Sequence, residues 1–340
     1  MADRFCLLDL NEKCIKTVLQ CSELFDLISF SLCSKKKLAN VRSLKLHIGI
    51  KLFCDTTFNA QFEFGANAIS LFFCEDGYDR EIAISDFQPR RLQVDYIEGE
   101  KLHWQDEYTE TTIRRWRKAN YQGNDWLRHF MSVFNCNEIR LLSVRANKFE
   151  IDSFMDTVQN LSISKTMILE TVSKQHTLSL LRALPCLEDL SVDSLSFDES
   201  SEYSILLRNQ QKLIVGTEAK ITLDIVLSVN SLALNVSEWP IKDVNRFIKL
   251  WKKGANPRLR FLYISFFANP HGAVVLNENN VLRGVQYKRM PQGTVRIFVM
   301  PADRMEIDRG FDIVGKTGRK ATVSLENTVM FPSFRMYIWQ

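Results

Sequence analysis

The first 44 residues carry apolar side chains at helical spacing in three short segments. The spacing predicts helices over 12–20 and 23–32 and a third that begins at Ser34. Asn11 precedes the first helix, and its side chain can accept a hydrogen bond from an amide of the first turn. Three helices within about forty residues enclose too small a core to be stable alone. They are therefore expected to leave apolar surface for something else to cover.

Beyond residue 44 the apolar positions alternate as they do in strands. Helical spacing returns at 109–118 and 125–134, and the second of these helices has one apolar face that should pack in the core. That face carries Trp126, Leu127, Phe130, Val133 and Phe134. The expected strands are 44–50, 58–64 and 68–73, with weaker ones at 81–84 and 92–96 and loops at 89–91 and 98–100.

A coarse repeat of strand-like runs follows from about residue 136. Mostly helical segments separate the runs, and successive centres lie 21–28 residues apart, which is within the period of about 20–29 residues of leucine-rich repeats. Residues 181–192 also have leucine-rich texture. One strand and one helix per repeat predict an irregular parallel sheet. The centres are Leu141, Ile168, Leu190, Leu213, Leu234 and Leu262.

Strand-like runs without long helices between them close the chain, at 294–300, 310–314, 321–325 and 333–339. They predict an antiparallel cap over the last repeat. The expected fold class is therefore α/β. The expected domains are a helical module at 1–44, a strand-rich then helical region at 45–135, and a leucine-rich-repeat-like region at 136–340.

The helix expected before residue 254 has clear ends, since Pro240 stands in its first turn and Gly254 just past its last. Trp251 continues the apolar face of this helix, so we predict that it packs in the core and not at a recognition surface. The apolar face carries Ile241, Val244, Phe247, Ile248 and Trp251, and the other face carries Lys242, Arg246, Lys249 and Lys253.

The N-terminal segment resembles an F-box, which joins a substrate receptor to the small adaptor of a cullin–RING ubiquitin ligase. Phe30-Ser31-Leu32-Cys33-Ser34-Lys35-Lys36 followed by Val41-Arg42-Ser43-Leu44 is similar to the large nematode set of F-box proteins. Leu10-Asn11 stands where the family has Leu-Pro, and Ser22-Glu23-Leu24 replaces a Met-Asp-Pro-like turn. On pattern alone, an ordinary amphipathic helical hairpin is the alternative.

The C-terminal part resembles the type-2 F-box-associated domain of nematodes. The resemblance covers about 210–340 and, with the F-box, about 5–44, whereas 45–210 is similar only loosely. It rests on Trp239, Asn245-Arg246-Phe247, Lys249-Leu250-Trp251, Gly254-Ala255-Asn256-Pro257-Arg258-Leu259, Phe311-Asp312-Ile313, Gly318, Ala321-Thr322-Val323 and Phe334-Arg335-Met336-Tyr337-Ile338-Trp339.

Together the two resemblances imply a non-catalytic substrate receptor of an SCF-type ubiquitin ligase. The implied partners are the adaptor, a cullin through it, and a protein target chosen by the C-terminal domain through residues that the sequence leaves unknown. A free-standing interaction scaffold that has lost adaptor binding is the alternative, because position 11 lacks proline. The implied adaptor-binding residues, which contact the adaptor in part and pack among themselves in part, are Leu8, Leu10, Ile15, Val18, Leu19, Leu27 and Leu32.

Composition is that of a globular protein, with 46% hydrophobic and 25% charged residues. A net charge of +4 on 340 residues favours neither a nucleic-acid nor a membrane partner. The chain has no apolar run of about eighteen residues and no signal-peptide pattern, so an intracellular location, cytoplasmic or nuclear, is expected. The eight cysteines are scattered and predict reduced thiols, with buried positions for the four in the N-terminal helices. Neither a metal nor a cofactor is expected.

One motif allows an enzyme as a third alternative. Residues 310–317 match the Gly-x-x-x-x-Gly-Lys-Thr pattern of a nucleotide-binding loop. Such a loop leads directly into a helix, whereas strand formers fill this one and Gly318 precedes an alternating run, which predicts a hairpin. The basic cluster at 114–118 has acidic neighbours and predicts a solvated helix face. The five histidines lie far apart and predict core or surface roles.

Overall fold

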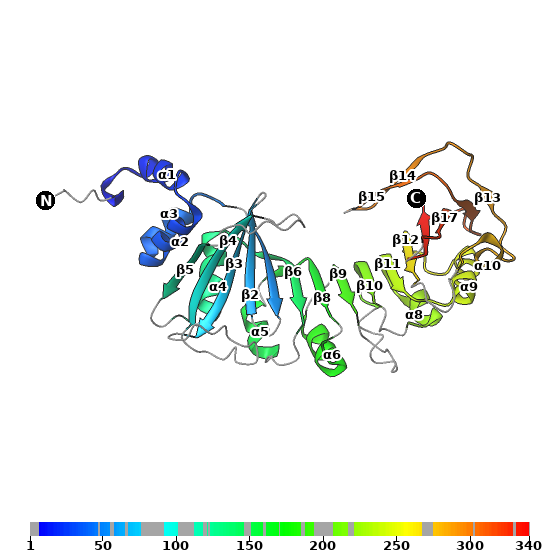
Figure 1. Cartoon of the computed structure of the whole chain (residues 1–340), viewed down its shortest axis with the longest axis horizontal. Coiled ribbons are helices and arrows are strands. Elements are labelled where there is room, and N and C mark those ends of the chain that lie inside the picture. The colour runs from blue at the N-terminus through cyan, green and yellow to red at the C-terminus, as the bar shows by residue number, and fades with distance from the viewer. Residues whose placement is uncertain are drawn as a thin grey trace. The chain divides into compact units, whose positions relative to one another are not determined.

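The structure is a computed structural model of a mixed α/β protein with a large sheet (Figure 1). The chain forms two compact units, Met1–Ser164 and Lys165–Gln340, and the domain boundaries expected at residues 44 and 135 remain predictions. The residues that the structure describes are 7–46, 48–54, 58–64, 67–75, 92–100, 112–117, 121, 123–145, 151–158, 161–169, 171–184, 188–193, 207–216, 221–266, 275–301, 303–328 and 331–339.

Three helices begin the first unit, as the sequence predicts. After a 3-10 turn at Leu7–Asp9 come α1 (Glu12–Gln20), α2 (Leu24–Cys33) and α3 (Lys35–Arg42). Asn11 Oδ1 accepts from the amide of Cys14 at 2.9 Å, and Ser34 Oγ accepts from the amide of Lys37 at 3.2 Å. Both bonds satisfy amides that a helix leaves unpaired in its first turn, and the predicted cap at Asn11 is confirmed.

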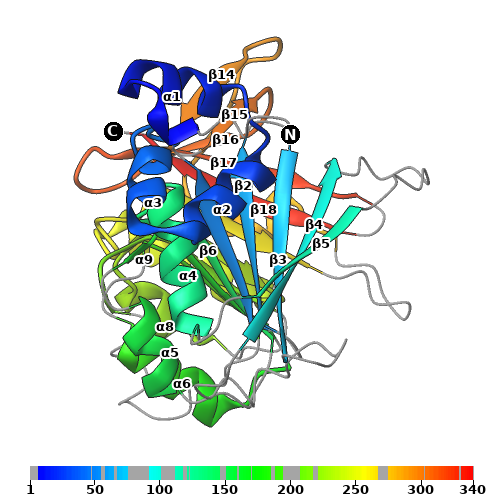
Figure 2. The ribbon, with the colours of Figure 1, turned by 90° about the vertical axis from the view of Figure 1, so that its left-hand side faces the viewer.

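Helix α4 (Gly123–Val133) covers part of the apolar surface of these helices, since it contacts both α2 and α3 (Figure 2). Ile28 of α2 and Val41 of α3 are completely buried. The predicted apolar face of α4 is confirmed, and each of its large residues is at most 1% exposed: Trp126, Leu127, Phe130, Val133 and Phe134. The N-terminal helices therefore share a core with the rest of the first unit.

The sheet of the first unit is an antiparallel meander flanked by two parallel strands. The ring of Phe62 in β2 packs against Phe130 and Phe134, with centroid separations of 5.9 and 4.8 Å, so the meander and α4 share this core. The meander runs β1 (Gly49–Cys54), β2 (Phe58–Phe64), β3 (Asn67–Glu75), β4 (Leu92–Glu100) and β5 (Thr112–Arg117). On the other side of β1 lie β6 (Glu138–Val144) and, after α5 (Ile151–Val158), β7 (Ser162–Ile163).

The helix predicted at 109–118 is wrong, because residues 112–117 form strand β5. Ile113 is opposite Ile97 of β4, and Trp116 is opposite Val94. β-branched and aromatic residues are favoured in such pairs, and the partner strand outweighs the local helical spacing.

Two further boundaries differ from the prediction. Residues 98–100 belong to β4 and not to a loop. The first strand starts at Gly49 and not at residue 44, because the chain turns at the end of α3 and Lys45 takes a φ of 53°. The ranges 81–84 and 89–91 lie outside the described residues.

Parallel strands at the predicted spacing build the first part of the second unit. Leu190, Leu213, Leu234 and Leu262 stand opposite one another on neighbouring strands, and none is more than 1% exposed. One leucine on each of four neighbouring strands therefore forms a buried ladder. The strands are β8 (Lys165–Ile168), β9 (Asp189–Val192), β10 (Gln210–Val215), β11 (Ser231–Ser237) and β12 (Phe261–Ser265), with helices α6 (Lys174–Ala183), α8 (Leu223–Ser228) and α9 (Ile241–Lys252) between them.

The predicted antiparallel cap is confirmed. It continues the sheet from β12 through β18 (Ser333–Ile338), β17 (Lys320–Glu326) and β16 (Phe311–Val314) to β13 (Lys288–Arg289). A separate hairpin of β14 (Arg296–Val299) and β15 (Arg304–Ile307) and the short helix α10 (Glu278–Val281) complete the unit. In the described part of the chain, no helix is long and apolar enough to cross a membrane.

Candidate functional site

The seven residues implied in adaptor binding divide by burial. Those that pack inside the first unit cannot also contact a partner, whereas the accessible ones present apolar surface that a partner could cover. The buried group is Ile15, Leu19 and Leu27, which are 7%, 3% and 4% exposed. The accessible group is Leu8, Leu10 and Leu32, which are half-buried, and Val18, which is 43% exposed.

A buried hydrogen bond joins α2 to α4. Ser31 Oγ lies 2.8 Å from His129 Nε2 and donates its own proton to the carbonyl of Ile28 at 2.6 Å. Because a hydroxyl has one proton, His129 is the donor in the shared bond. Both side chains are buried, so of the core and surface roles predicted for the histidines, His129 has the core role. His47 and His271 lie outside the described residues.

The thiols of Cys14, Cys21 and Cys33 are exposed, so the prediction that they are buried is wrong. Cys6, the fourth cysteine of that prediction, lies outside the described residues. In α1 the inward positions belong to Ile15 and Leu19, which turns Cys14 outward. Burial raises the pKa of the Cys54 thiol well above its ordinary value. The described residues contain no group of three or more His, Cys, Asp or Glu side chains that could hold a metal ion.

The Gly-Lys-Thr segment forms a hairpin, as predicted. The chain turns after β16 and enters β17, with the amide of Gly315 donating to the carbonyl of Arg319 at 2.8 Å and Gly318 at a φ of 80°. A strand and not a helix follows Lys316 and Thr317. The segment that follows the loop therefore provides no helix N-terminus for a phosphate group.

Helix α9 has the two faces that the sequence predicts. Trp251 is 2% exposed, which confirms its place in the core, and the guanidinium of Arg319 lies 5.8 Å from its ring centroid. Gly254 follows the helix at a φ of 108°, a conformation that favours glycine. Val244, Phe247 and Ile248 are buried with Trp251, Ile241 is half-buried, and Lys242, Arg246, Lys249 and Lys253 are exposed.

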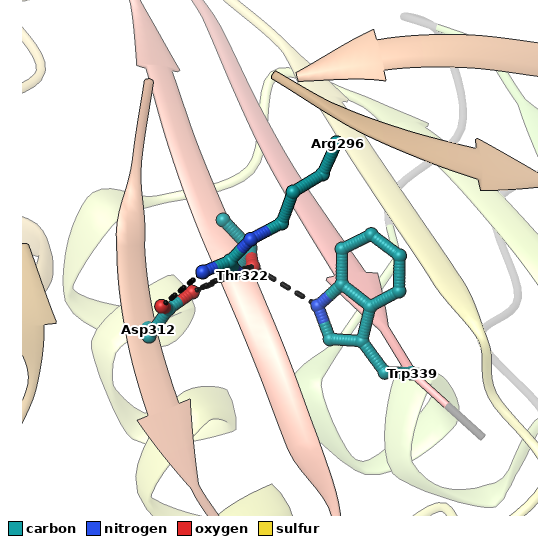
Figure 3. Close-up of polar contacts among 4 residues, drawn as sticks. All are labelled: Arg296, Asp312, Thr322 and Trp339. Carbon is teal, nitrogen blue, oxygen red and sulfur yellow. Dashed lines mark hydrogen bonds and ion pairs between the residues drawn. The ribbon is translucent and has the colours of Figure 1, made fainter. Parts of the chain in front are cut away.

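A polar network that the sequence does not reveal connects the hairpin β14–β15 to the cap (Figure 3). Arg296 Nη1 and Nη2 donate to the two carboxylate oxygens of Asp312 at 2.7 and 2.9 Å. Thr322 Oγ1 donates to Asp312 at 2.8 Å and accepts from the indole of Trp339 at 3.0 Å. Burial acts to raise the pKa of Asp312, but the hydrogen bonds from Arg296 and Thr322 together hold it below its usual range.

An aromatic cluster lies next to this network. The ring of Phe298 in β14 packs against Tyr337 at a centroid separation of 5.3 Å, against Trp339 at 5.4 Å and against Phe261 at 6.2 Å. Aromatic pairs at such separations stabilise the packing of buried rings. The ion pair therefore holds the hairpin against β16, and the cluster holds it against β12 and β18. The hydrogen bond to Thr322 and the contact with Phe298 orient the indole of Trp339.

Comparison with known protein families gives a match to the F-box-associated family over residues 203–264. This segment includes β10, α8, β11, α9 and nearly all of β12, and so contains Trp251 and three leucines of the ladder. No curated protein and no solved structure matches the chain. A segment of the second unit is thus similar to the F-box-associated family.

Proposed function

We propose that the protein is the substrate-recognition subunit of an SCF-type ubiquitin ligase, with an F-box at 1–44 and a nematode-type F-box-associated domain at about 210–340. The match of residues 203–264 to the F-box-associated family carries the proposal. Three N-terminal helices, of which α1 and α3 are capped by side chains, support it. Ubiquitin transfer would belong to other subunits, so the chain needs no nucleophile.

The accessible group of Leu8, Leu10, Val18 and Leu32 is the proposed contact with the adaptor, which in turn binds a cullin. Ile15, Leu19 and Leu27 are buried, so they would stabilise the helices that carry this surface. The second unit, with its parallel strands separated by helices, would bind the target protein. The proposed complex is intracellular and involves neither nucleic acid nor membrane.

The test introduces a charge at the centre of the proposed contact. Full-length wild type and Val18→Asp would be co-expressed with the adaptor and the cullin, and the retained subunits quantified after purification. A carboxylate buried in an apolar interface lacks solvation, so we expect Val18→Asp to lose most of the adaptor. Val314→Asp is the matched control, because Val314 is 50% exposed on β16 in the second unit.

Retention of the adaptor by Val18→Asp at the wild-type level would contradict the proposed contact. Loss by both variants would indicate a general effect of the new charge. A folded wild type that retains no adaptor would favour the free-standing scaffold, the alternative suggested by Asn11 in the place of proline. Thermal melting of all three proteins separates these results from unfolding.

A further inference from the structure

A pocket of about 640 Å³ in the second unit is lined by four cationic side chains. It lies where the N-terminal ends of β11 and β12 meet the turn between β16 and β17 and the end of β18. None of the described residues that line it is acidic. The cations are Arg258, Arg260, Arg319 and Lys320, and Ile338 and Trp339 supply apolar wall.

The three arginines are half-buried, yet in the described part of the chain none of them forms an ion pair. Two other half-buried arginines of this unit behave differently. Arg296 and Arg335 each contact a carboxylate at 2.7 Å. Removing a charge from water is costly unless a counter-charge is present. The pocket therefore gathers positive charge that no described carboxylate neutralises.

The pocket arginines make their hydrogen bonds within the protein to neutral acceptors. A guanidinium carries several N–H donors, so each arginine keeps donors for a ligand. Arg260 Nε in particular is buried and has no hydrogen-bond partner among the described residues, and burial lowers the pKa of Arg319. The neutral acceptors are Asn209 Oδ1 for Arg258 at 2.6 Å, the Val299 carbonyl for Arg260 at 3.4 Å, and the Leu259 carbonyl for Arg319 at 2.8 Å.

Aromatic rings hold the pocket in shape before any ligand binds. Arg260 lies 5.9 Å from the ring centroid of Phe298, and Arg319 lies over Trp251. The indole of Trp339 is fixed by its hydrogen bond to Thr322. Groups that are already oriented lose less entropy on binding, so the pocket is preorganised for an anion with an apolar flank.

On the basis of the receptor function proposed above, we propose that this pocket binds an anionic side chain of the target protein, a carboxylate or a phosphate. Guanidinium groups match the geometry of both anions. The apolar wall of Trp339 and Ile338 suits the residues that flank such a group in a peptide. Nucleic acid fits less well, because the whole chain carries only +4 and strong nucleic-acid binders present a larger basic surface.

The test uses the full-length chain without adaptor and three fluorescent peptide libraries with degenerate flanks. The fixed central residue is glutamate, phosphoserine or glutamine, and binding is measured by fluorescence anisotropy. The pocket variant is the double substitution Arg258→Gln and Lys320→Gln. The control is Lys242→Gln with Arg283→Gln, which removes the same charge from another groove of this unit, between α9 and α10.

We expect the glutamate or the phosphoserine library to bind about tenfold more tightly than the glutamine library, and which of the two binds better identifies the anion. In the pocket variant, the affinity for the acidic library should fall about tenfold. The control variant should bind that library as tightly as the wild type does. Equal affinity for all three libraries, or equal loss in both variants, would overturn the proposal. The proposal would also be overturned if a single-stranded oligonucleotide bound more tightly than the peptides and the pocket variant abolished that binding. Co-purification of the adaptor with the pocket variant tests the proposed receptor function independently of peptide binding.

Discussion

Asp312 is the residue at which the hairpin, the cap and the pocket wall are connected. Its carboxylate accepts from Arg296 of β14 and from Thr322 of β17, and Thr322 accepts from Trp339. Hydrogen bonds to a charged acceptor are shorter and stronger than neutral ones. The ionised form of Asp312 thus stabilises the position of the hairpin as well as the orientation of the indole.

Replacing Asp312 with asparagine should lower the free energy of unfolding at neutral pH by about 1–2 kcal/mol, because a charged acceptor is lost at a partly exposed site. The folded pKa of Asp312 is depressed, so its stabilisation is present above the unfolded pKa of about 3.9 and is lost as pH falls through the folded value. Urea unfolding at several pH values checks this. The difference between wild type and Asp312→Asn should shrink below about pH 4, and a constant difference would contradict the role of the charge.

At the scale of elements, prediction from the sequence is most accurate where a single residue marks the centre of a strand or the end of a helix. Leu190, Leu213, Leu234 and Leu262 centre the predicted strands and stand side by side in the sheet. The ends of α9 are similarly readable, since proline and glycine act through the local backbone. These signals are local, and no partner strand is needed to interpret them.

Elements and contacts that depend on distant partners could not be predicted. Strand β5 was expected to be helical because its pairing with β4 is not visible in its own spacing. Arg296, Asp312 and Thr322 meet only through the register of β16 with β17 and the position of the hairpin. The cationic pocket likewise combines residues from four separate segments of the second unit. The arginines of the pocket do not form a recognisable motif in the sequence.

The start of α1 offers a test of capping against backbone rigidity. Asn11 has a φ of −66°, which proline can adopt, so Asn11→Pro should gain about 0.4–1 kcal/mol from the unfolded state. It also loses the cap to Cys14, which costs about 0.5–2 kcal/mol. We therefore expect little change or a small net loss in the urea midpoint. Asn11→Ala loses the cap without the gain and should be less stable than the proline variant. A proline variant clearly more stable than wild type would show that the cap contributes little.

At the scale of the whole molecule, the two proposed functions lie in different compact units. The accessible group belongs to Met1–Ser164, and the F-box-associated match and the pocket belong to Lys165–Gln340. The N-terminal helices are not an isolated module within the first unit, because Ser31 and His129 join α2 to α4. Point substitutions in the full chain therefore test adaptor binding better than removal of the helices, which would expose the core around α4.

Trp251→Ala tests whether the second unit can be destabilised while adaptor binding persists. Trp251 is 2% exposed, and its truncation leaves a large cavity, so we expect a loss of about 3–5 kcal/mol in the stability of the second unit. Trp251→Phe is the control. It keeps most of the volume and removes Nε1–H, which has no hydrogen-bond partner among the described residues, so its cost should be about 1.5 kcal/mol or less.

Thermal melting and adaptor co-purification of the two Trp251 variants would be measured together. Because the accessible group lies in the first unit, the adaptor should be retained by both variants at temperatures below the melting transition. Binding of the acidic libraries should weaken in Trp251→Ala alone, since Arg319 lies over this ring and lines the pocket. Unchanged melting of Trp251→Ala would contradict its core role. Simultaneous loss of the adaptor would instead show that the folding of one unit depends on the other.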